Sequence, residues 1–418
     1  MNMNEPKLRF KADDGSQFPD WEEKSFGDFF ITHSEKTSDR DSYPLYSLTI
    51  ESGVQPKTER YEREFLVKKE GDNYKIVPPN AFVYNPMNLR FGALKVNHEK
   101  FSVSVSGYYN VFSLKDDSAL AFWENYLVTH GMLNYYFSIA TGSLIEKLRV
   151  HYSQFMRIKK AVPSLPEQQK IAEFLVAIGT VIEKQKETVS AWEERKKGVM
   201  QKLFSQEVRF KADDGSEFPE WEEKSFSDVF ENLNNSTFSR DCLNYETGNV
   251  KYIHYGDILI KFGFVIDVQS SNVPYVNEDL NCEKYASLSE GDIVIADTAE
   301  DDTVGKAVEV MNTHWGKTIS GLHTIACHPM GKFASKYLGY FMNSDIYHNQ
   351  LRPYMQGIKV TSVSKTNIAL TKILVPCLVE QQKIADCLSA LDEVIEKQKA
   401  TLAAWEELKK GLLQQMFV

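Results

Sequence analysis

No apolar run in this 418-residue sequence approaches the roughly 20 residues that a membrane-spanning helix requires. The opening stretch, MNMNEPKLRF, has no hydrophobic signal core, so we expect a cytoplasmic protein that contacts no membrane. Cysteine is scarce, and the set is odd and scattered without a CxxC pair, which argues for reduced thiols and against disulfides or a zinc site. The cysteines are Cys242, Cys282, Cys327, Cys377 and Cys387.

Motifs for catalysis, cofactors or metals are also missing. No glycine-rich phosphate-binding loop is present, and the nine histidines show no metal-binding spacing. His323 and His328 flank Cys327, but nothing completes a ligand set, so we interpret them as buried strand histidines. The stretch Tyr84-Asn85-Pro86-Met87 lacks the second proline and the aromatic residue of the amino-methyltransferase motif. The sequence therefore predicts a chain with no catalytic residue and no bound metal.

The formal net charge of −10 counts against an acidic partner such as nucleic acid. The charge is unevenly distributed, however. Residues 25–160 contain 17 basic and 15 acidic residues, a net of +2, and residues 352–372 contain four basic residues and no acid. Because local fields decide phosphate binding, the acidic total weakens a nucleic-acid hypothesis without excluding it.

A long repeat organises the chain. Residues 167–204 return as residues 380–417 with 24 identities in 38 positions. Apolar residues recur every three or four positions, the heptad spacing of a helix that packs on another helix. We predict two helices of about 57 Å that pair antiparallel, the first opened by a capping box of Ser164 and Glu167. The predicted seam is Ile171, Leu175, Ile178, Ile182, Val189 and Trp192 with Ile384, Leu388, Leu391, Ile395, Leu402 and Trp405.

A second repeat precedes each globular segment. Residues 9–30 return as residues 209–230 with 18 identities in 22 positions. The block is acidic, with a turn at Asp13-Asp14-Gly15 and an apolar anchor at Trp21. We expect these connectors to dock against the long helices, with their acidic residues facing protein rather than DNA.

The segments between the repeats, residues 31–165 and 231–378, differ from each other and read as strand-rich. Strands are predicted within residues 43–50, 74–79, 81–86, 101–114, 250–260, 291–296, 306–311 and 323–328, and helices within 118–140 and 333–354. The fold expected is α+β: two strand-rich α/β globular domains separated by an antiparallel pair of long coiled-coil helices, with a pseudo-two-fold internal repeat. The predicted segments are 1–30 (tail and first connector), 31–165, 166–204 (long helix), 205–230 (second connector), 231–378 and 379–418 (long helix).

The EQQKIA helix opening after a proline-ended strand, and the duplicated F-x-x-W-x-x-x-x-F connector, resemble the specificity subunit of type I restriction-modification systems. YKIVPPNAFVYNPMNLRFGALKV at 74–96 resembles a target-recognition segment of that family, as do GDIVIA and SGLHTIACHP in the second half. The resemblance covers nearly the whole chain. It implies a non-catalytic, host-defence subunit in which residues 31–165 and 231–378 are target-recognition domains, each reading one half of a bipartite asymmetric DNA site.

The same resemblance implies the partners. These would be double-stranded DNA, two methyltransferase subunits docked on the long helices, and a restriction subunit that translocates DNA. S-adenosylmethionine, ATP and Mg²⁺ are expected only in those partner subunits, and no cofactor in this chain.

Candidate DNA-binding residues are basic side chains for phosphates and a few polar side chains for base edges. An ordinary solvated surface charge is the competing interpretation for each lysine. The candidates are Lys68, Lys69, Asn85, Arg90, Lys95, Lys147 and Arg149 in the first domain and Tyr255, Lys261, Lys306, Arg352, Gln356, Lys359, Thr361 and Lys365 in the second.

Two other classes of function stay open. The chain could be an architectural scaffold whose coiled-coil helices bind partner helices without DNA specificity, or an enzyme with an unfamiliar site. Dissimilar domains on a duplicated scaffold favour the DNA reader, because identical readers would require a palindromic site.

Overall fold

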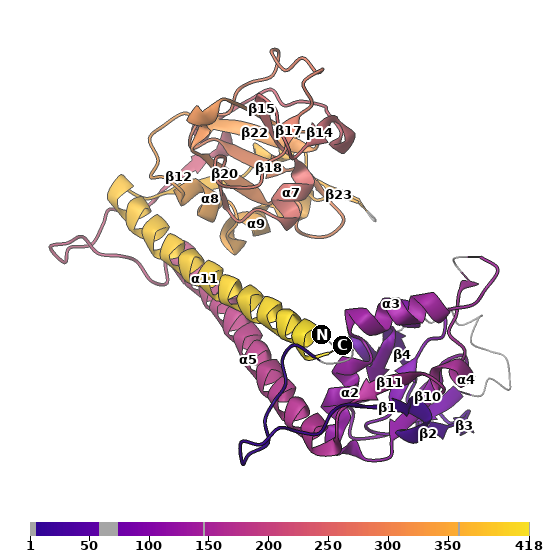
Figure 1. The fold of residues 1–418 in the computed structure, drawn as a ribbon. Coiled ribbons are helices and arrows are strands. Elements are labelled where there is room, and N and C mark those ends of the chain that lie inside the picture. Colours follow the sequence, from indigo (N-terminus) through magenta and orange to yellow (C-terminus); the bar gives the residue numbers. More distant parts are fainter. Residues whose placement is uncertain (1–5, 58–73, 145–146, 358–359, 418) are drawn as a thin grey trace. The chain divides into compact units, whose positions relative to one another are not determined.

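The computed structural model describes residues 6–57, 74–144, 147–357 and 360–417 (Figure 1). Two compact units make up the chain. Unit 1 is Met1–Glu187 with Ala400–Val418, and unit 2 is Thr188–Lys399. Each unit therefore takes one half of both long helices together with one globular domain. The boundaries of the six segments proposed from the sequence stay predictions.

The two long helices are α5 (Leu165–Phe204) and α11 (Leu378–Met416). They pair antiparallel in unit 2, where Lys399 lies 3.0 Å from Glu193 and Lys196 lies 2.5 Å from Asp392. In unit 1, the later part of α11 lies beside the earlier part of α5, with Lys186 3.9 Å from Glu406. The antiparallel pair predicted from the heptads is thus present in both units.

The seam residues differ in depth. Most aliphatic seam residues are buried, whereas both tryptophans and two leucines are only partly buried. Buried are Ile171, Leu175, Ile178, Ile182, Val189, Ile384, Leu388 and Ile395, and partly buried are Trp192, Leu391, Leu402 and Trp405.

The capping box expected at the start of α5 does not form. Among the described residues the buried Ser164 hydroxyl has no hydrogen-bond partner. The Glu167 carboxylate instead accepts hydrogen bonds from Arg9 at 3.0 and 2.8 Å and from the Trp21 indole at 3.2 Å. The prediction was wrong because a charged guanidinium from the connector satisfies the carboxylate better than a backbone amide does.

Both connectors dock as predicted on the start of a long helix. In unit 2, Arg209 donates to Glu380 at 3.0 and 2.8 Å, and Trp221 donates to it at 2.9 Å. Each connector also adds one strand to the segment that leads into the helix, because β1 pairs antiparallel with β11 and β12 with β24. The polypeptide thus enters and leaves each globular domain at the same point.

The globular domain of unit 1 is built on a four-stranded antiparallel sheet in the order β2-β10-β7-β8. Phe82 on β7 and Phe112 on β10 stack at 5.1 Å, and Trp123 on α2 packs on the same core. Strands are β1 Glu22–Ser25, β2 Phe30–His33, β3 Lys36–Thr37, β4 Tyr46–Thr49, β5 Gly53–Pro56, β6 Tyr74–Val77, β7 Phe82–Tyr84, β8 Leu94–Val96, β9 Val103–Val105, β10 Asn110–Leu114 and β11 Lys159–Val162; helices are α2 Leu120–Tyr126, α3 His130–Ile139, α4 Tyr152–Phe155, η1 Phe26–Asp28, η3 Leu89–Phe91 and η4 Asp117–Ala119.

The domain of unit 2 has a five-stranded sheet, β13-β22-β18-β20-β16, and a four-stranded sheet, β14-β17-β15-β21. Strands are β12 Glu222–Ser225, β13 Phe230–Asn232, β14 Leu243–Asn244, β15 Val250–Ile253, β16 Val265–Asp267, β17 Tyr275–Val276, β18 Ile293–Ala296, β19 Thr298–Ala299, β20 Ala307–Met311, β21 Lys317–Ser320, β22 Thr324–Pro329, β23 Thr361–Ser362 and β24 Lys372–Val375; helices are α6 Phe226–Val229, α7 Tyr255–Ile260, α8 Tyr337–Phe341, α9 Asp345–Leu351, α10 Lys365–Ile368, η6 Arg240–Cys242, η7 Thr313–Trp315 and η8 Arg352–Tyr354.

Three local expectations were wrong. The run 250–260 is strand only to Ile253 and then forms α7, where His254 caps the helix by accepting a hydrogen bond from Gly256 N–H at 3.0 Å. Each long aromatic helical stretch is broken into two helices by a new cap, Thr129 in unit 1 and Ser344 in unit 2. His323 is exposed rather than buried in a strand, and the His328 side chain is 46% exposed beside Asp292.

Candidate nucleic-acid interface

In unit 1 a turn after β7 carries two of the candidate residues. The Asn85 carboxamide oxygen accepts a hydrogen bond from Met87 N–H at 3.0 Å and holds the turn. Arg90 follows on η3, with its guanidinium carbon 4.7 Å from the centre of the Phe91 ring and 5.8 Å from that of Phe137 on α3. The guanidinium lies beside both rings, and its Nε and Nη1 atoms are buried.

A loop after α3 lies against this turn. Thr141 and Arg149 exchange backbone hydrogen bonds of 2.9 and 3.0 Å, and Val150 N–H donates to the Pro86 carbonyl at 3.0 Å. The Lys147 and Arg149 side chains are exposed there. The fold thus brings four sequence-predicted residues onto neighbouring loops of unit 1, namely Asn85, Arg90, Lys147 and Arg149.

Sequence reasoning missed two aromatic residues at this surface. Phe91 is 53% exposed and Phe137 is 57% exposed, although large apolar rings are normally covered. Exposed aromatic rings beside cations are a common feature of surfaces that stack on nucleotide bases. No periodic pattern predicts them, because their exposure depends on how α3 meets the turn after β7.

The other candidates of the first domain are placed elsewhere or lie outside the description. Lys95 on β8 is partly buried and lines a hollow shared with Glu99 and Glu124. Lys68 and Lys69 lie outside the described residues.

Unit 2 repeats the loop arrangement with different residues. Gln356 and Ser362 exchange backbone hydrogen bonds of 3.1 and 2.9 Å, and Val363 N–H donates to the Asp297 carbonyl at 2.9 Å. Gly357 has φ +124°, and a Cβ there would lie 1.8 Å from the Val360 carbonyl oxygen, so this loop requires glycine. The two units therefore share one pattern of backbone hydrogen bonds between the loop before the last strand and a loop of the sheet.

The two sets of loops carry opposite charge. Residues 85–92 of unit 1 contain Arg90 and no acid, whereas residues 297–306 of unit 2 contain four acids and one lysine. Beside the acidic loop, His323 Nδ1 lies 3.6 Å from Asp297 Oδ1, and the His323 ring lies 5.3 Å from that of Tyr255. The surfaces that the duplicated scaffold presents are thus chemically unlike.

Two lysine candidates of unit 2 are engaged within the protein. Lys306 donates to the carbonyls of Leu259 and Phe262 at 3.2 and 2.8 Å. Burial, with a smaller effect of nearby Lys196, lowers the Lys306 pKa to about 8. Lys261 Nζ lies 3.3 Å from the buried Asp257 carboxylate. We therefore leave both lysines out of the proposed interface.

The remaining candidates gather at the edge of the paired strands β19 and β23. Thr361 lies on β23 opposite Ala299, and exposed Gln356 begins the loop. Arg352 on η8 and Lys365 on α10 are exposed on the flanking helices. Lys359 lies outside the described residues.

Comparison with known proteins shows which proteins this chain resembles. Residues 219–404 match the sequence model described as the type I restriction modification DNA specificity domain. The chain is 26% identical over 274 residues to the type I restriction enzyme MjaVIII specificity subunit of Methanocaldococcus jannaschii, covering 62% of this chain and 61% of that protein. Residues 219–404 thus resemble a type I restriction modification DNA specificity domain, and the chain is similar to type I restriction enzyme specificity subunits.

A second specificity subunit of the same organism, the putative MjaX subunit, is 24% identical over 295 residues, covering 69% of this chain and 65% of that protein. The matches thus span less than two thirds of either relative. Two solved structures share the fold at 13% identity: the S subunit of a type I restriction-modification system from M. genitalium (TM-score 0.52, 99% of both chains) and a chain from a study of type I complex assembly (TM-score 0.54, 96% of this chain and 98% of that one).

Two kinds of feature are absent from the part of the chain that the structure describes. No helix there is both long and apolar enough to cross a membrane. Within the same residues, no group of three or more His, Cys, Asp or Glu side chains could hold a metal ion.

Proposed function

We propose that this chain is the DNA-recognition subunit of a type I restriction-modification complex. Each globular domain would read one half of a bipartite asymmetric site, and α5 and α11 would fix the half-site spacing and dock two methyltransferase subunits. A restriction subunit that translocates DNA would join them. The observation that carries the proposal is the pair of equivalent loop sites with unlike chemistry, residues 85–92 in unit 1 and 297–306 in unit 2.

The chemistry of the two loops suits the recognition of two different bases. An arginine such as Arg90 would donate to an acceptor of guanine, whereas a carboxylate such as Asp297 would accept from the N4 amino group of cytosine. The exposed Lys147, Arg149 and Arg352 would bind phosphates, which supply affinity without sequence information. An asymmetric target therefore suits this chain better than a palindrome.

The long helices suit a spacer. The 40 residues of α5 make a rod of about 60 Å, which corresponds to roughly 18 base pairs and sets an upper limit on the distance between the two half-sites. The chain itself would be non-catalytic, with S-adenosylmethionine, ATP and Mg²⁺ bound by the partner subunits.

Methylation mapping of a genome that expresses this chain with its partners tests the proposal. We expect one bipartite motif with two unlike halves and a fixed gap. Replacing residues 231–378 by the corresponding domain of another specificity subunit should change one half only, and deleting four residues from one long helix should change the gap. A swap that altered both halves, or a gap indifferent to the deletion, would contradict the proposal.

A scaffold without DNA specificity is the second candidate, and the acidic loop at residues 297–306 favours it because carboxylates repel phosphates. Retention of specific duplex DNA by the chain with its methyltransferase partner separates the two. Complex formation without any preference among DNA sequences would favour the scaffold.

A further inference from the structure

Each unit has a groove between the α5–α11 pair and the corner where two short helices of its globular domain meet. Groove 1, in unit 1, has a volume of about 710 Å³, and groove 2, in unit 2, about 570 Å³. The helix positions that line them correspond one to one with an offset of 213 residues. Groove 1 is lined on the long helices by Gly179, Ile182, Glu183, Lys186, Glu406, Lys409, Lys410, Leu413 and Gln414, and groove 2 by Asp392, Ile395, Glu396, Lys399, Glu193, Lys196, Lys197, Met200 and Gln201.

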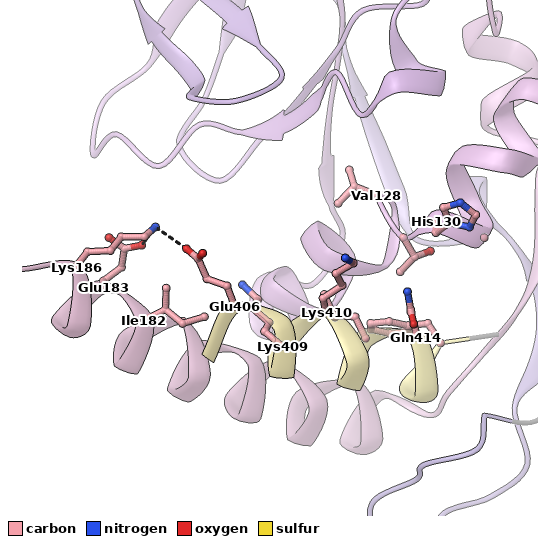
Figure 2. A pocket seen from close by; sticks show the side chains of 14 residues that line it. Val128, His130, Ile182, Glu183, Lys186, Glu406, Lys409, Lys410 and Gln414 are labelled. Carbon is pink, nitrogen blue, oxygen red and sulfur yellow. Dashed lines mark hydrogen bonds and ion pairs between the residues drawn. The ribbon is translucent and has the colours of Figure 1, made fainter. Parts of the chain in front are cut away.

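Figure 2 shows groove 1, where a cluster of Glu183, Lys186 and Glu406 lies at one end and His130 with Gln414 lies at the other. Lys186 lies 3.0 Å from Glu183 and 3.9 Å from Glu406. Apolar side chains form part of the floor, namely Ile182 from α5, Leu413 from α11 and Phe417 just after α11. An apolar floor with charged rims is the usual receptor for an amphipathic helix.

The helix positions of the two grooves differ at two aligned pairs. Leu413 against Met200 keeps an apolar side chain, whereas Gly179 in groove 1 against Asp392 in groove 2 changes the charge. Asp392 Oδ1 lies 2.5 Å from Lys196 Nζ, and Asp392 Oδ2 accepts a hydrogen bond from the Tyr340 hydroxyl at 2.6 Å. Lys196 also lies 4.4 Å from the centre of the Phe264 ring, and its side chain is only 13% exposed. In groove 2, therefore, the protein's own Asp392 carboxylate neutralises the charge of Lys196.

In groove 1 the counterpart of Lys196 is Lys409. Among the described residues Lys409 makes no ion pair, hydrogen bond or ring contact, whereas its neighbour Lys410 lies 3.3 Å from Glu407. Gly179 offers no carboxylate, and nothing lies within 4 Å of the position that its Cβ would occupy. Groove 1 thus keeps a lysine and an open space where groove 2 has a closed ion pair.

We infer that groove 1 binds a carboxylate-bearing helix of the docked protein subunit more tightly than groove 2 does, so that the two copies of that subunit assemble in order. The inference rests on the proposed docking of two methyltransferase subunits. A carboxylate on the incoming helix gains a new pair with Lys409, but in groove 2 it must compete with Asp392 for Lys196. The same surface of the partner subunit therefore binds this chain with two different affinities, one at each groove.

Stepwise titration of the full chain with the methyltransferase subunit of its own system, followed by native mass spectrometry and calorimetry, tests this. The wild-type chain should show two separable steps. Gly179→Asp should weaken the tighter step by about three- to fivefold, the range of an exposed ion pair, while Gly179→Asn, which has the same size without the charge, should not. Lys409→Gln should reproduce the loss, and the control Lys24→Gln, an exposed connector lysine, should change neither step.

The reverse change is made in groove 2. Asp392→Asn keeps an acceptor for Tyr340 but frees Lys196, so the weaker step should tighten toward the first. Two equal steps in the wild-type chain, or no response to Gly179→Asp and Lys409→Gln, would overturn the inference while leaving DNA recognition intact. If Lys409→Gln weakened binding of duplex DNA but not of the subunit, groove 1 would bind phosphate instead. Absence of subunit binding in every variant would overturn both proposals.

Discussion

Arg9 and Glu167 form a two-point contact, with Nε 3.0 Å from Oε1 and Nη2 2.8 Å from Oε2, and the glutamate side chain is completely buried. Arg209 and Glu380 repeat it at the same distances. Because removal of one partner leaves a buried charge uncompensated, we expect Arg9→Ala to lower the free energy of unfolding by roughly 3 to 5 kcal/mol. Chemical denaturation of the full chain measures the change.

Lys24 provides a matched control for this prediction. It lies 3.0 Å from Glu22 on the solvent side of the same connector. Lys24→Ala should cost under about 1 kcal/mol, as exposed pairs usually do. Equal effects of the two substitutions would show that the connector is not held by the buried pair.

The seam of the long helices should respond according to depth. Leu388 is fully buried, so Leu388→Ala should cost about 2 to 5 kcal/mol. Trp192, in the same unit, is only partly buried, so Trp192→Ala should cost less than the roughly 3 to 5 kcal/mol typical of a buried aromatic residue. A larger loss at Trp192 than at Leu388, seen in urea denaturation, would mean that the tryptophan is the principal contact.

The stability of unit 2 should fall as the pH rises toward neutrality. Burial raises the Glu309 pKa from its ordinary value to about 7, although its carboxylate accepts hydrogen bonds from Lys336 N–H at 2.5 Å and Gly339 N–H at 2.8 Å. The folded state therefore holds a proton that the unfolded state releases above about pH 4.5. This contribution is complete below that pH and is lost as the pH passes through 7, on the order of 2 to 3 kcal/mol.

Glu309→Gln isolates the effect, because glutamine stays neutral throughout. The unfolding free energies of the wild type and the variant should converge near pH 5 and separate by pH 8, with the wild type the less stable. Parallel curves between those pH values would show that Glu309 does not titrate there.

Arg149 tests the proposed DNA surface of unit 1. Arg149→Gln should weaken binding to all duplex sequences and reduce the slope of log affinity against log salt by about 1, as loss of one phosphate contact does. Fluorescence anisotropy at several salt concentrations measures both quantities, again with Lys24→Gln as control. A loss of preference at a single base pair, with the slope unchanged, would make Arg149 a base reader instead.

The duplicated framework could be predicted from the sequence because it depends on local periodicity. The heptads around Ile171 and Ile384 predict helices that pack on each other, and the repeated Trp21 and Trp221 predict connectors that dock on them. The break at Thr129 was missed because a side-chain cap competes with the apolar pattern that continues through it.

The candidate interface was harder to predict from the sequence. Lys306 reads as a surface cation, yet it lies against carbonyls that only the folded α7 region supplies. Phe137 has the composition of a core residue, yet it is exposed beside Arg90 of the turn after β7. Both outcomes depend on contacts between segments distant in sequence, and neither propensity nor spacing contains them.

The amide of Leu8 donates to the carbonyl of Gln415 at 3.0 Å, and the amide of Val208 donates to the carbonyl of Lys202 at 3.2 Å. The second bond spans a few residues of continuous polypeptide, whereas the first joins stretches more than 400 residues apart in the sequence. In both units the end of a long helix therefore meets the start of a connector. Continuous polypeptide makes this connection in unit 2, and non-covalent contacts make it in unit 1. A chain opened between Lys202 and Val208 and linked covalently between Gln415 and Leu8 should therefore keep both units folded.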